Sequence, residues 1–157
     1  MQTGGTGRPL YIFDLDGTLA LIEHRRHFIE NRKRRWKEFF AACIDDAPNP
    51  PVLTVFTHLR AVSEVRIFSG RSDEVRTQTV DWLERHTGLT KLDIEDCLIM
   101  RRSGDYTPDD VLKRQWLRDL PEHDRRRLVA VFDDRDRIVA MWRAEGVACF
   151  QVAPGNF

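Results

Sequence analysis

The sequence lacks features that would identify several classes of protein. It contains no hydrophobic run long enough to span a membrane and no stretch typical of a signal peptide, which predicts a cytoplasmic protein without a membrane partner. Its three cysteines, Cys43, Cys97 and Cys149, show no C-x-x-C spacing, so no disulfide framework or zinc site is indicated. Because 25 basic residues balance 25 acidic ones, net charge indicates no partner either.

A nucleotide-binding P-loop and internal repeats are also missing. The first nine residues contain three glycines, but no strand precedes them and no Gly-Lys-Ser/Thr follows. We predict that residues 1–9 are a flexible lead-in. The remaining chain, residues 10–157, is predicted to form a single domain, because 157 residues suffice for one core.

Apolar runs alternate with helix-like segments along the chain. Continuous apolar runs are typical of parallel strands that are covered on both faces, so we predict an α/β fold with a doubly wound, mostly parallel, Rossmann-like sheet. A loop is expected at 45–51, and Ser72 and Thr107 are expected to cap helices. Strands are expected at 11–13, 65–68, 97–100, 128–132 and 147–152, and helices at 21–42 (broken near Asn31), 52–62, 73–87, from 108 onward, and 137–144.

The first apolar run leads directly into the sequence Asp-Leu-Asp-Gly-Thr at residues 14–18. Ligands of open α/β sheets bind at the carboxyl ends of the strands. Side chains two residues apart on a continuing strand point the same way, so Asp14 and Asp16 are expected to face one point. Two neighbouring carboxylates repel each other unless a proton or a metal lies between them. The alternative is an ordinary Asp-Gly turn.

Polar groups also follow the other predicted strands. Parallel topology would bring these ends to one edge of the sheet, which favours a shared site. Taken alone, Ser69 and Gly70 could form a simple turn, and Lys113 could be a solvated lysine that pairs with Asp109. The groups are Ser69, Gly70 and Arg71 after the second strand, Asp109 and Lys113 in the helix after the third, and Asp133 and Asp134 after the fourth.

The 14–18 sequence resembles the first motif of the haloacid dehalogenase-like phosphohydrolases. The resemblance implies an aspartate nucleophile, Asp14, an aspartate acid/base, Asp16, and a Mg²⁺ ion. The metal ligands would be Asp14, the backbone carbonyl of Asp16, and Asp133 or Asp134. Ser69 would bind a phosphoryl oxygen and Lys113 would neutralise the phosphoryl group. Thr18 and Gly70 are also placed among the substrate-binding residues.

The later motifs are similar to the phosphatase half of phage-type polynucleotide kinase/3′-phosphatases. The similarity rests on Ser-Gly-Arg at 69–71, the segment 104–113, Asp-Asp-Arg at 133–135 and the segment 141–155. It implies that Arg25, Arg71 and Asp109 join the catalytic and substrate-binding set. The kinase half of that family, with its P-loop, has no counterpart here, which argues against 5′-kinase activity.

The segment from Arg25 to Lys37 is the most basic in the chain. It is either a solvated helix face or a surface that contacts a phosphate backbone. Neither gap between the motifs is long enough for a folded lid, and an open site admits a polymer end. We therefore expect an Mg²⁺-dependent phosphomonoesterase that removes a 3′-terminal phosphate from nucleic acid ends or 3′-nucleotides, with a separate kinase or ligase as a candidate partner.

Two alternatives remain at this point. One is a phosphatase of free mononucleotides or other small phosphomonoesters. The other is a non-catalytic module that binds phosphorylated ends or a protein. All four tryptophans are expected to be core or half-buried residues.

Overall fold

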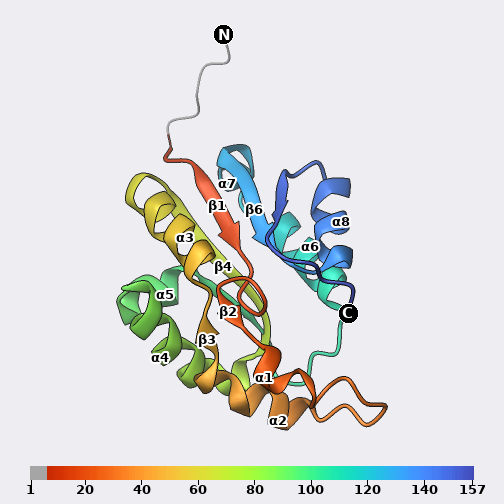
Figure 1. Ribbon diagram of the computed structural model, residues 1–157. Helices are drawn as coiled ribbons and strands as arrows, with labels where there is room; N and C mark the ends of the chain where they lie inside the picture. Colours follow the sequence, from red (N-terminus) through yellow and green to blue (C-terminus); the bar gives the residue numbers. More distant parts are fainter. Residues whose placement is uncertain (1–6) are drawn as a thin grey trace.

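The computed structural model describes residues 7–157, and its centre is a five-stranded parallel sheet (Figure 1). The strand order is β5-β4-β1-β6-β7, so the first strand lies in the middle and the chain winds outward in both directions. This confirms the predicted doubly wound, parallel α/β architecture. The strands are β1 (Leu10–Phe13), β4 (Glu64–Ser72), β5 (Leu98–Arg101), β6 (Leu128–Asp133) and β7 (Cys149–Gln151).

Helices cover both faces of the sheet, and each face has its own core. Alternate residues of β1 serve the two cores: Phe13 packs with Phe56 and Trp82 on one face, and Ile12 packs with Trp142 on the other. Because the central strand β1 is covered on both sides, it reads as a continuous apolar run, whereas the edge strand β7 leaves Phe150 and Gln151 exposed. The helices are α3 (Pro50–Val62), α4 (Arg76–Thr87) and α5 (Lys91–Cys97) for the first face, and α6 (Asp109–Asp119) and α8 (Asp136–Ala144) for the second, with α7 (Glu122–Arg127) before β6.

The segment between β1 and α3 forms a small insertion at the carboxyl end of the sheet. It contains the antiparallel pair β2 (Ala20–Leu21) and β3 (Ala47–Pro48), the helices α1 (Glu23–Arg26) and α2 (Trp36–Ala41), and the 3₁₀ turn η1 (Ala42–Asp45). Its longest element, α2, has six residues, which agrees with the prediction that no folded lid is present.

The predicted helical segment over 21–42 does break around Asn31, but the break is longer than expected, because residues 27–35 leave helical conformation and only α1 and α2 remain helical. Four consecutive cations at 32–35 repel one another, and this stretch has no apolar face with which to pack. The backbone N–H of Arg35 donates instead to the carbonyl of Phe28 at 2.8 Å, which closes a loop between α1 and α2. The predicted 45–51 loop likewise contains β3, whose partner strand was not foreseen.

Smaller differences concern helix starts and short helices. Thr107 does not cap α6: Pro108 occupies the cap position, and Thr107 N–H donates to Asp105 Oδ1 at 2.9 Å. Ser72 does act as a cap, but for the 3₁₀ turn η2 (Asp73–Val75) that precedes α4. Gly88, at φ 68°, ends α4 as predicted. The short helices α5 and α7 were not predicted.

The start of the chain is only partly described. Residues 1–6 of the predicted lead-in lie outside the described residues, whereas the carbonyl of Pro9 accepts a hydrogen bond from Glu64 N–H at 2.8 Å. None of the described helices is long and apolar enough to cross a lipid bilayer.

Candidate active site

Three central strands deliver polar groups to one edge of the sheet. β1 ends at Phe13, so Asp14 is the first residue beyond it, and its N–H donates to the carbonyl of Phe132 in β6 at 2.9 Å. Asp133 ends β6 and Ser69 lies near the end of β4. The predicted convergence of these strand ends is therefore present in the structure.

Three carboxylates, those of Asp14, Asp133 and Asp134, gather at this edge. Each offers an oxygen within 4.8 Å of the others, and all three residues are buried. Lys113 from α6 reaches between them: its Nζ donates to Asp14 Oδ1 at 2.6 Å and to Asp133 Oδ2 at 2.8 Å. One ammonium group therefore faces three acidic side chains.

The excess of carboxylates changes their titration. Burial raises the pKa of Asp14 well above its usual value; the nearby Lys113 opposes the shift, and Asp133 and Asp134 add to it. Burial and the Asp133 charge raise the pKa of Asp134 to about 7. Burial lowers the pKa of Lys113, but Asp133 and Asp14 outweigh burial, so the pKa of this lysine is raised.

The residues of this cluster fit a divalent cation. Asp134 Oδ1 is buried and has no hydrogen-bond partner among the described residues, so an acceptor is left for a ligand. Oxygen atoms are the ligands that Mg²⁺ prefers. A cation would also balance the negative charge of the carboxylates that Lys113 alone does not neutralise. Asp14, Asp133 and Asp134 could hold it.

The turn after Asp14 explains the glycine and the threonine of the motif. Gly17 adopts φ 84°, and a Cβ at this position would lie 2.1 Å from Asp134 Oδ2, so a side chain would displace that carboxylate. Thr18 is buried, and its hydroxyl donates to Asp14 Oδ2 at 3.1 Å. The turn therefore does more than reverse the chain, because it orients Asp14 beside Asp134.

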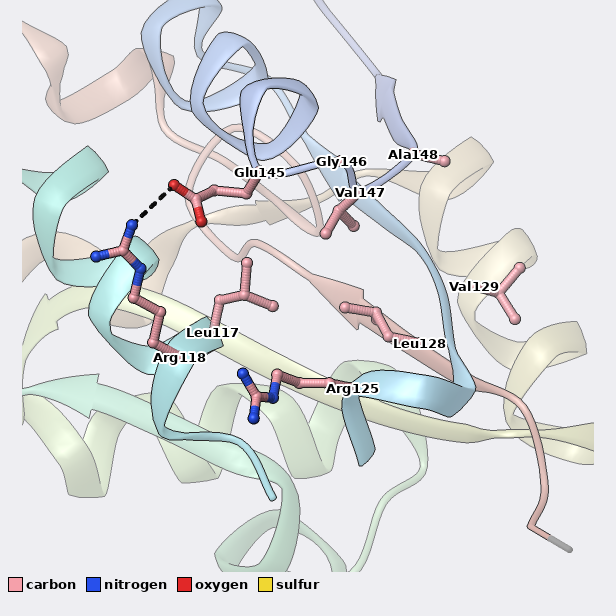
Figure 2. Close-up of a pocket in the computed structure, with 9 residues that line it drawn as sticks. All are labelled: Leu117, Arg118, Arg125, Leu128, Val129, Glu145, Gly146, Val147 and Ala148. Atoms are coloured by element: carbon pink, nitrogen blue, oxygen red, sulfur yellow. Dashed lines mark hydrogen bonds and ion pairs between the residues drawn. The ribbon is translucent and has the colours of Figure 1, made fainter. Parts of the chain in front are cut away.

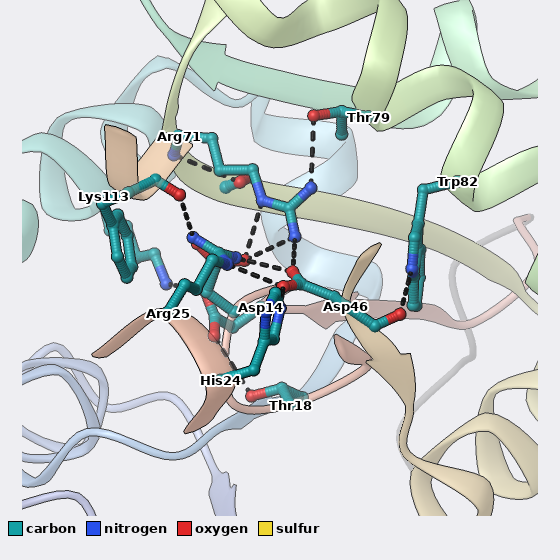
Figure 3. A network of polar contacts seen from close by, with 12 residues as sticks. Asp14, Thr18, His24, Arg25, Asp46, Arg71, Thr79, Trp82 and Lys113 are labelled. Carbon is teal, nitrogen blue, oxygen red and sulfur yellow. Dashed lines mark hydrogen bonds and ion pairs between the residues drawn. The ribbon is translucent and has the colours of Figure 1, made fainter. Parts of the chain in front are cut away.

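Asp16 belongs to a second cluster, with Arg25, Arg71 and Asp46. The last three are labelled in Figure 3. Arg25 Nη2 and Arg71 Nε each donate to Asp16 Oδ1 at 2.7 Å. The same guanidinium groups donate to Asp46, Arg25 through Nε and Nη2 at 2.6 Å and Arg71 through Nη2 at 2.7 Å. Both arginine side chains are fully buried, so two carboxylates balance two buried cations.

The two motif aspartates are thus separated into two environments. The continuing strand expected through both residues is wrong, because β1 ends at Phe13 and the chain turns, with Gly17 N–H donating to Ala20 O at 2.8 Å, so it is this turn and not the pleat of a strand that orients the two side chains. Burial raises the pKa of Asp16, but Arg71 and Arg25 outweigh it and hold the pKa below its usual value. Asp16 is therefore ionised at neutral pH in this state.

The remaining predicted residues line the same edge. Ser69 is buried, and its Oγ accepts a hydrogen bond from Arg71 N–H at 3.2 Å. A Cβ on Gly70 would lie 2.8 Å from Asp109 Oδ1, so glycine lets this carboxylate approach. Asp109 is held by two arginines: Arg101 donates to Oδ1, and Arg135 Nη1 donates to Oδ2 at 2.6 Å.

Sequence reasoning missed Asp46, Arg101 and Arg135. Arg101 ends β5 and Arg135 follows the Asp-Asp pair, so the rule that polar strand ends converge could have found both. No comparable signal marks Asp46, which comes to the site through the unforeseen β2–β3 pair. Its partner His24, with Nε2 2.7 Å from Asp46 Oδ1, was missed for the same reason.

A hollow of about 430 Å³ lies at the other end of the sheet (Figure 2). Two of its three charged residues, Arg118 and Glu145, pair with each other at 3.3 Å. It is remote from the carboxylate clusters and is not the site described here. Its lining consists of Leu117, Arg118, Arg125, Leu128, Val129, Glu145, Gly146, Val147 and Ala148.

Comparison with known proteins agrees with the geometry of the site. Residues 8–157 match the family described as the polynucleotide kinase PNKP phosphatase domain. A protein of Autographa californica nuclear polyhedrosis virus, named "Putative bifunctional polynucleotide kinase/RNA ligase", is 29% identical over 132 residues, which cover 83% of this chain and 17% of the viral protein.

Solved structures resemble the whole described fold. A chain of the Pnkp1/Rnl/Hen1 RNA repair complex superposes with a TM-score of 0.76 and 29% identity, covering 97% of this chain and 45% of that one. The class C acid phosphatase of Bacillus anthracis shares the fold, with a TM-score of 0.65 and 14% identity over 98% of this chain and 69% of that one. The chain thus spans less than half the length of the viral protein and of the repair-complex chain.

Proposed function

This chain belongs to the family of polynucleotide kinase phosphatase domains, and from that premise we propose that it removes the 3′-terminal phosphate of a nucleic acid through an aspartyl-phosphate on Asp14. The observation that carries the proposal is the position of Asp14. Its carboxylate lies at the centre of the sheet edge, bonded to Lys113 and Thr18, beside two further carboxylates that suit a cation.

The first half of the reaction breaks the phosphate ester. An oxygen of Asp14 attacks phosphorus in line and forms the new P–O bond, while the bond to the 3′-oxygen breaks. That oxygen leaves as a hydroxyl after taking a proton from Asp16. Ser69, Thr18 and Lys113 bind the phosphoryl oxygens, and Mg²⁺ held by Asp14, the Asp16 carbonyl, Asp133 and Asp134 would neutralise charge on the phosphoryl group.

The second half returns the enzyme to its starting state. Water attacks the phosphoryl group, its proton passes to Asp16, and Asp14 is released as a carboxylate together with inorganic phosphate. The ionised Asp16 of the free structure is in the form that this step needs. The first half needs its protonated form, and a phosphate dianion that draws Arg25 and Arg71 toward itself would raise the Asp16 pKa.

The proposal is tested by release of phosphate in the presence of Mg²⁺ from matched oligonucleotides that carry either a 3′- or a 5′-phosphate. We expect a strong preference for the 3′-phosphorylated oligonucleotide. The 3′- and 5′-mononucleotides serve as comparison substrates. Preference for a mononucleotide would keep the chemistry but replace the substrate, and absence of release from every substrate would reject the function.

A metal ion is expected to stabilise the folded protein. Because Mg²⁺ binds the assembled carboxylates and not the unfolded chain, a hundredfold excess over its Kd adds about 2.7 kcal/mol, or roughly 5–10 °C in Tm for a chain of this size. Thermal denaturation with and without millimolar Mg²⁺ measures the shift. Asp133→Asn should remove it and the exposed Asp119→Asn should retain it. An unchanged wild-type Tm would contradict the metal site.

We further propose that a kinase or ligase acts on the same ends. Removal of a 3′-phosphate leaves the 3′-hydroxyl that end-joining chemistry requires. The viral relative and the repair complex support this context, because the name of the first includes a kinase and an RNA ligase and the second is an RNA repair assembly. The partner activity can lie in the same polypeptide or in another.

A further inference from the structure

The insertion after β1 carries an exposed, positively charged loop, which we call the basic arm and define as residues 28–36. Figure 1 shows it projecting from the body between α1 and α2. Every residue from Asn31 to Glu38 is exposed. Four consecutive cations occupy 32–35, and Lys37 follows. Among the described residues, no carboxylate lies within ion-pair distance of any of these five, whereas most other arginines of the chain are paired.

The structure removes the simpler explanation for these charges. A solvated helix face would place cations around a regular helix, but residues 27–35 are not helical and present their charges on a projecting loop. Holding so many unpaired like charges together is unfavourable for the isolated protein. A polyanion would neutralise them and release its own counterions, which makes binding favourable.

Aromatic rings lie among the cations of the basic arm. The guanidinium of Arg35 stands over the ring of Phe28 at 4.7 Å, and that of Arg34 lies 5.9 Å from the ring of Trp36. Trp36 is 44% exposed, contrary to the prediction that it is a core or half-buried residue, and it stacks at 5.9 Å on Phe40. Exposed aromatic faces beside cations are the surface on which unstacked bases and their backbone bind.

The two roots of the basic arm are fixed to the candidate active site. Arg25, three residues before the arm, donates to Asp16 and to the carbonyl of Phe39, three residues after it. The same guanidinium stands over the Phe39 ring at 4.2 Å. Both ends of the arm therefore lie close to the buried arginine that holds the proposed acid/base. A polynucleotide that extends from the site toward the arm would pass over the arm.

We propose that the basic arm binds the single-stranded segment next to the terminal phosphate, so that the substrate of this site is a single-stranded polynucleotide. Cations at 32–34 contact backbone phosphates and Trp36 stacks on a base. A duplex would hide the base faces that Trp36 needs, whereas a free mononucleotide offers no second phosphate to the arm. The proposal rests on the proposed function only for the position of the terminal phosphate.

Charge removal on the arm is the first test. In the variant Arg32→Gln/Lys33→Gln/Arg34→Gln, we expect kcat/KM for a short 3′-phosphorylated single strand to fall about tenfold. The slope of log(kcat/KM) against log salt concentration should become shallower by about 2, because each lost phosphate contact accounts for about 0.7. Activity on a small aryl phosphate should not change. Trp36→Ala should lower oligonucleotide kcat/KM by about tenfold through lost stacking. The exposed positions make both variants compatible with folding.

The matched control removes the same charge elsewhere. Arg118→Gln/Arg125→Gln/Arg126→Gln changes three exposed arginines of α6 and α7, near the amino end of β6. This control variant should leave the activity on the oligonucleotide and on the aryl phosphate unchanged. If the arm variants match this control, or if they lose aryl phosphate activity equally, the proposal is overturned.

A binding measurement separates this proposal from the proposed function. Fluorescence anisotropy of a labelled single strand, with and without a 3′-phosphate, reports affinity without turnover. Weaker binding by the arm variants, with the control variant unchanged, supports the arm even if wild type releases no phosphate. Unchanged binding rejects the arm even if phosphatase activity is present.

Discussion

Asp14→Asn is expected to abolish turnover, lowering kcat by at least a factor of about a thousand. Removal of the nucleophile of a well-studied protease costs on the order of 10⁶ in kcat, and an amide oxygen cannot form the acyl phosphate that the reaction requires. Phosphate release from a 3′-phosphorylated oligonucleotide, followed to long times with wild type in parallel, measures the effect.

The variant should keep its fold. Asparagine has nearly the shape of aspartate and can still accept the hydrogen bond of the Thr18 hydroxyl. Lys113 keeps its bond to Asp133, and one of three clustered carboxylates is removed, which relieves repulsion. Circular dichroism and Tm close to those of wild type would show that the lost activity is chemical.

Asp124→Asn is the matched control, since Asp124 is a buried aspartate far from the carboxylate clusters. Burial raises its pKa, but hydrogen bonds from Arg127 and Arg66 lower it to about 2. Its loss should therefore cost about 1–3 kcal/mol of stability and leave kcat unchanged. If Asp14→Asn retains even about a tenth of the wild-type rate, the nucleophile is wrongly assigned.

The parts of the site that could be predicted are those fixed by parallel strands. Asp14 and Asp133 each follow a run that is apolar because both sheet faces are covered, and parallel strands place their ends at one edge. Lys113 was predicted from its place in the helix after the third strand. These residues meet in the structure, at 2.6–2.8 Å from the lysine, although they span 120 positions.

The insertion was harder because its structure depends on contacts with the rest of the molecule. Segments of four to six residues carry weak helical preferences of their own. The two-residue strands β2 and β3 exist only through each other. Asp46 is placed by this pair and by Trp82, whose indole donates to its carbonyl at 2.8 Å. No local pattern at 45–51 announces a buried carboxylate.

The division of Asp14 and Asp16 between two clusters follows from the same contacts. The motif alone fixes neither the residue at which β1 ends nor the side chains with which Asp14 and Asp16 pair beyond that point. Arg25 was included in the site through resemblance, and its role as a bridge between Asp16 and Asp46 became visible only in three dimensions. Sequence thus predicted which residues meet more reliably than how they pair.

Asp46→Asn is expected to destabilise the protein by about 3–5 kcal/mol, the usual cost of breaking one side of a buried ion pair. Asp46 is 3% exposed and accepts bonds from both Arg25 and Arg71. An amide would leave two buried guanidinium groups facing the single charge of Asp16, and its NH₂ group would point at further donors. Urea denaturation and a Tm lowered by roughly 6–20 °C measure the loss.

The neighbouring Asp45→Asn provides the control for this variant, because Asp45 is exposed and, among the described residues, makes no ion pair with Arg25 or Arg71. It should change stability by less than about 0.5 kcal/mol. A loss below about 1 kcal/mol for Asp46→Asn would mean that Arg25 and Arg71 find other acceptors. A full loss would show instead that Asp46 keeps the two arginines paired in the core, so that they can hold Asp16 in place without being left as uncompensated charges.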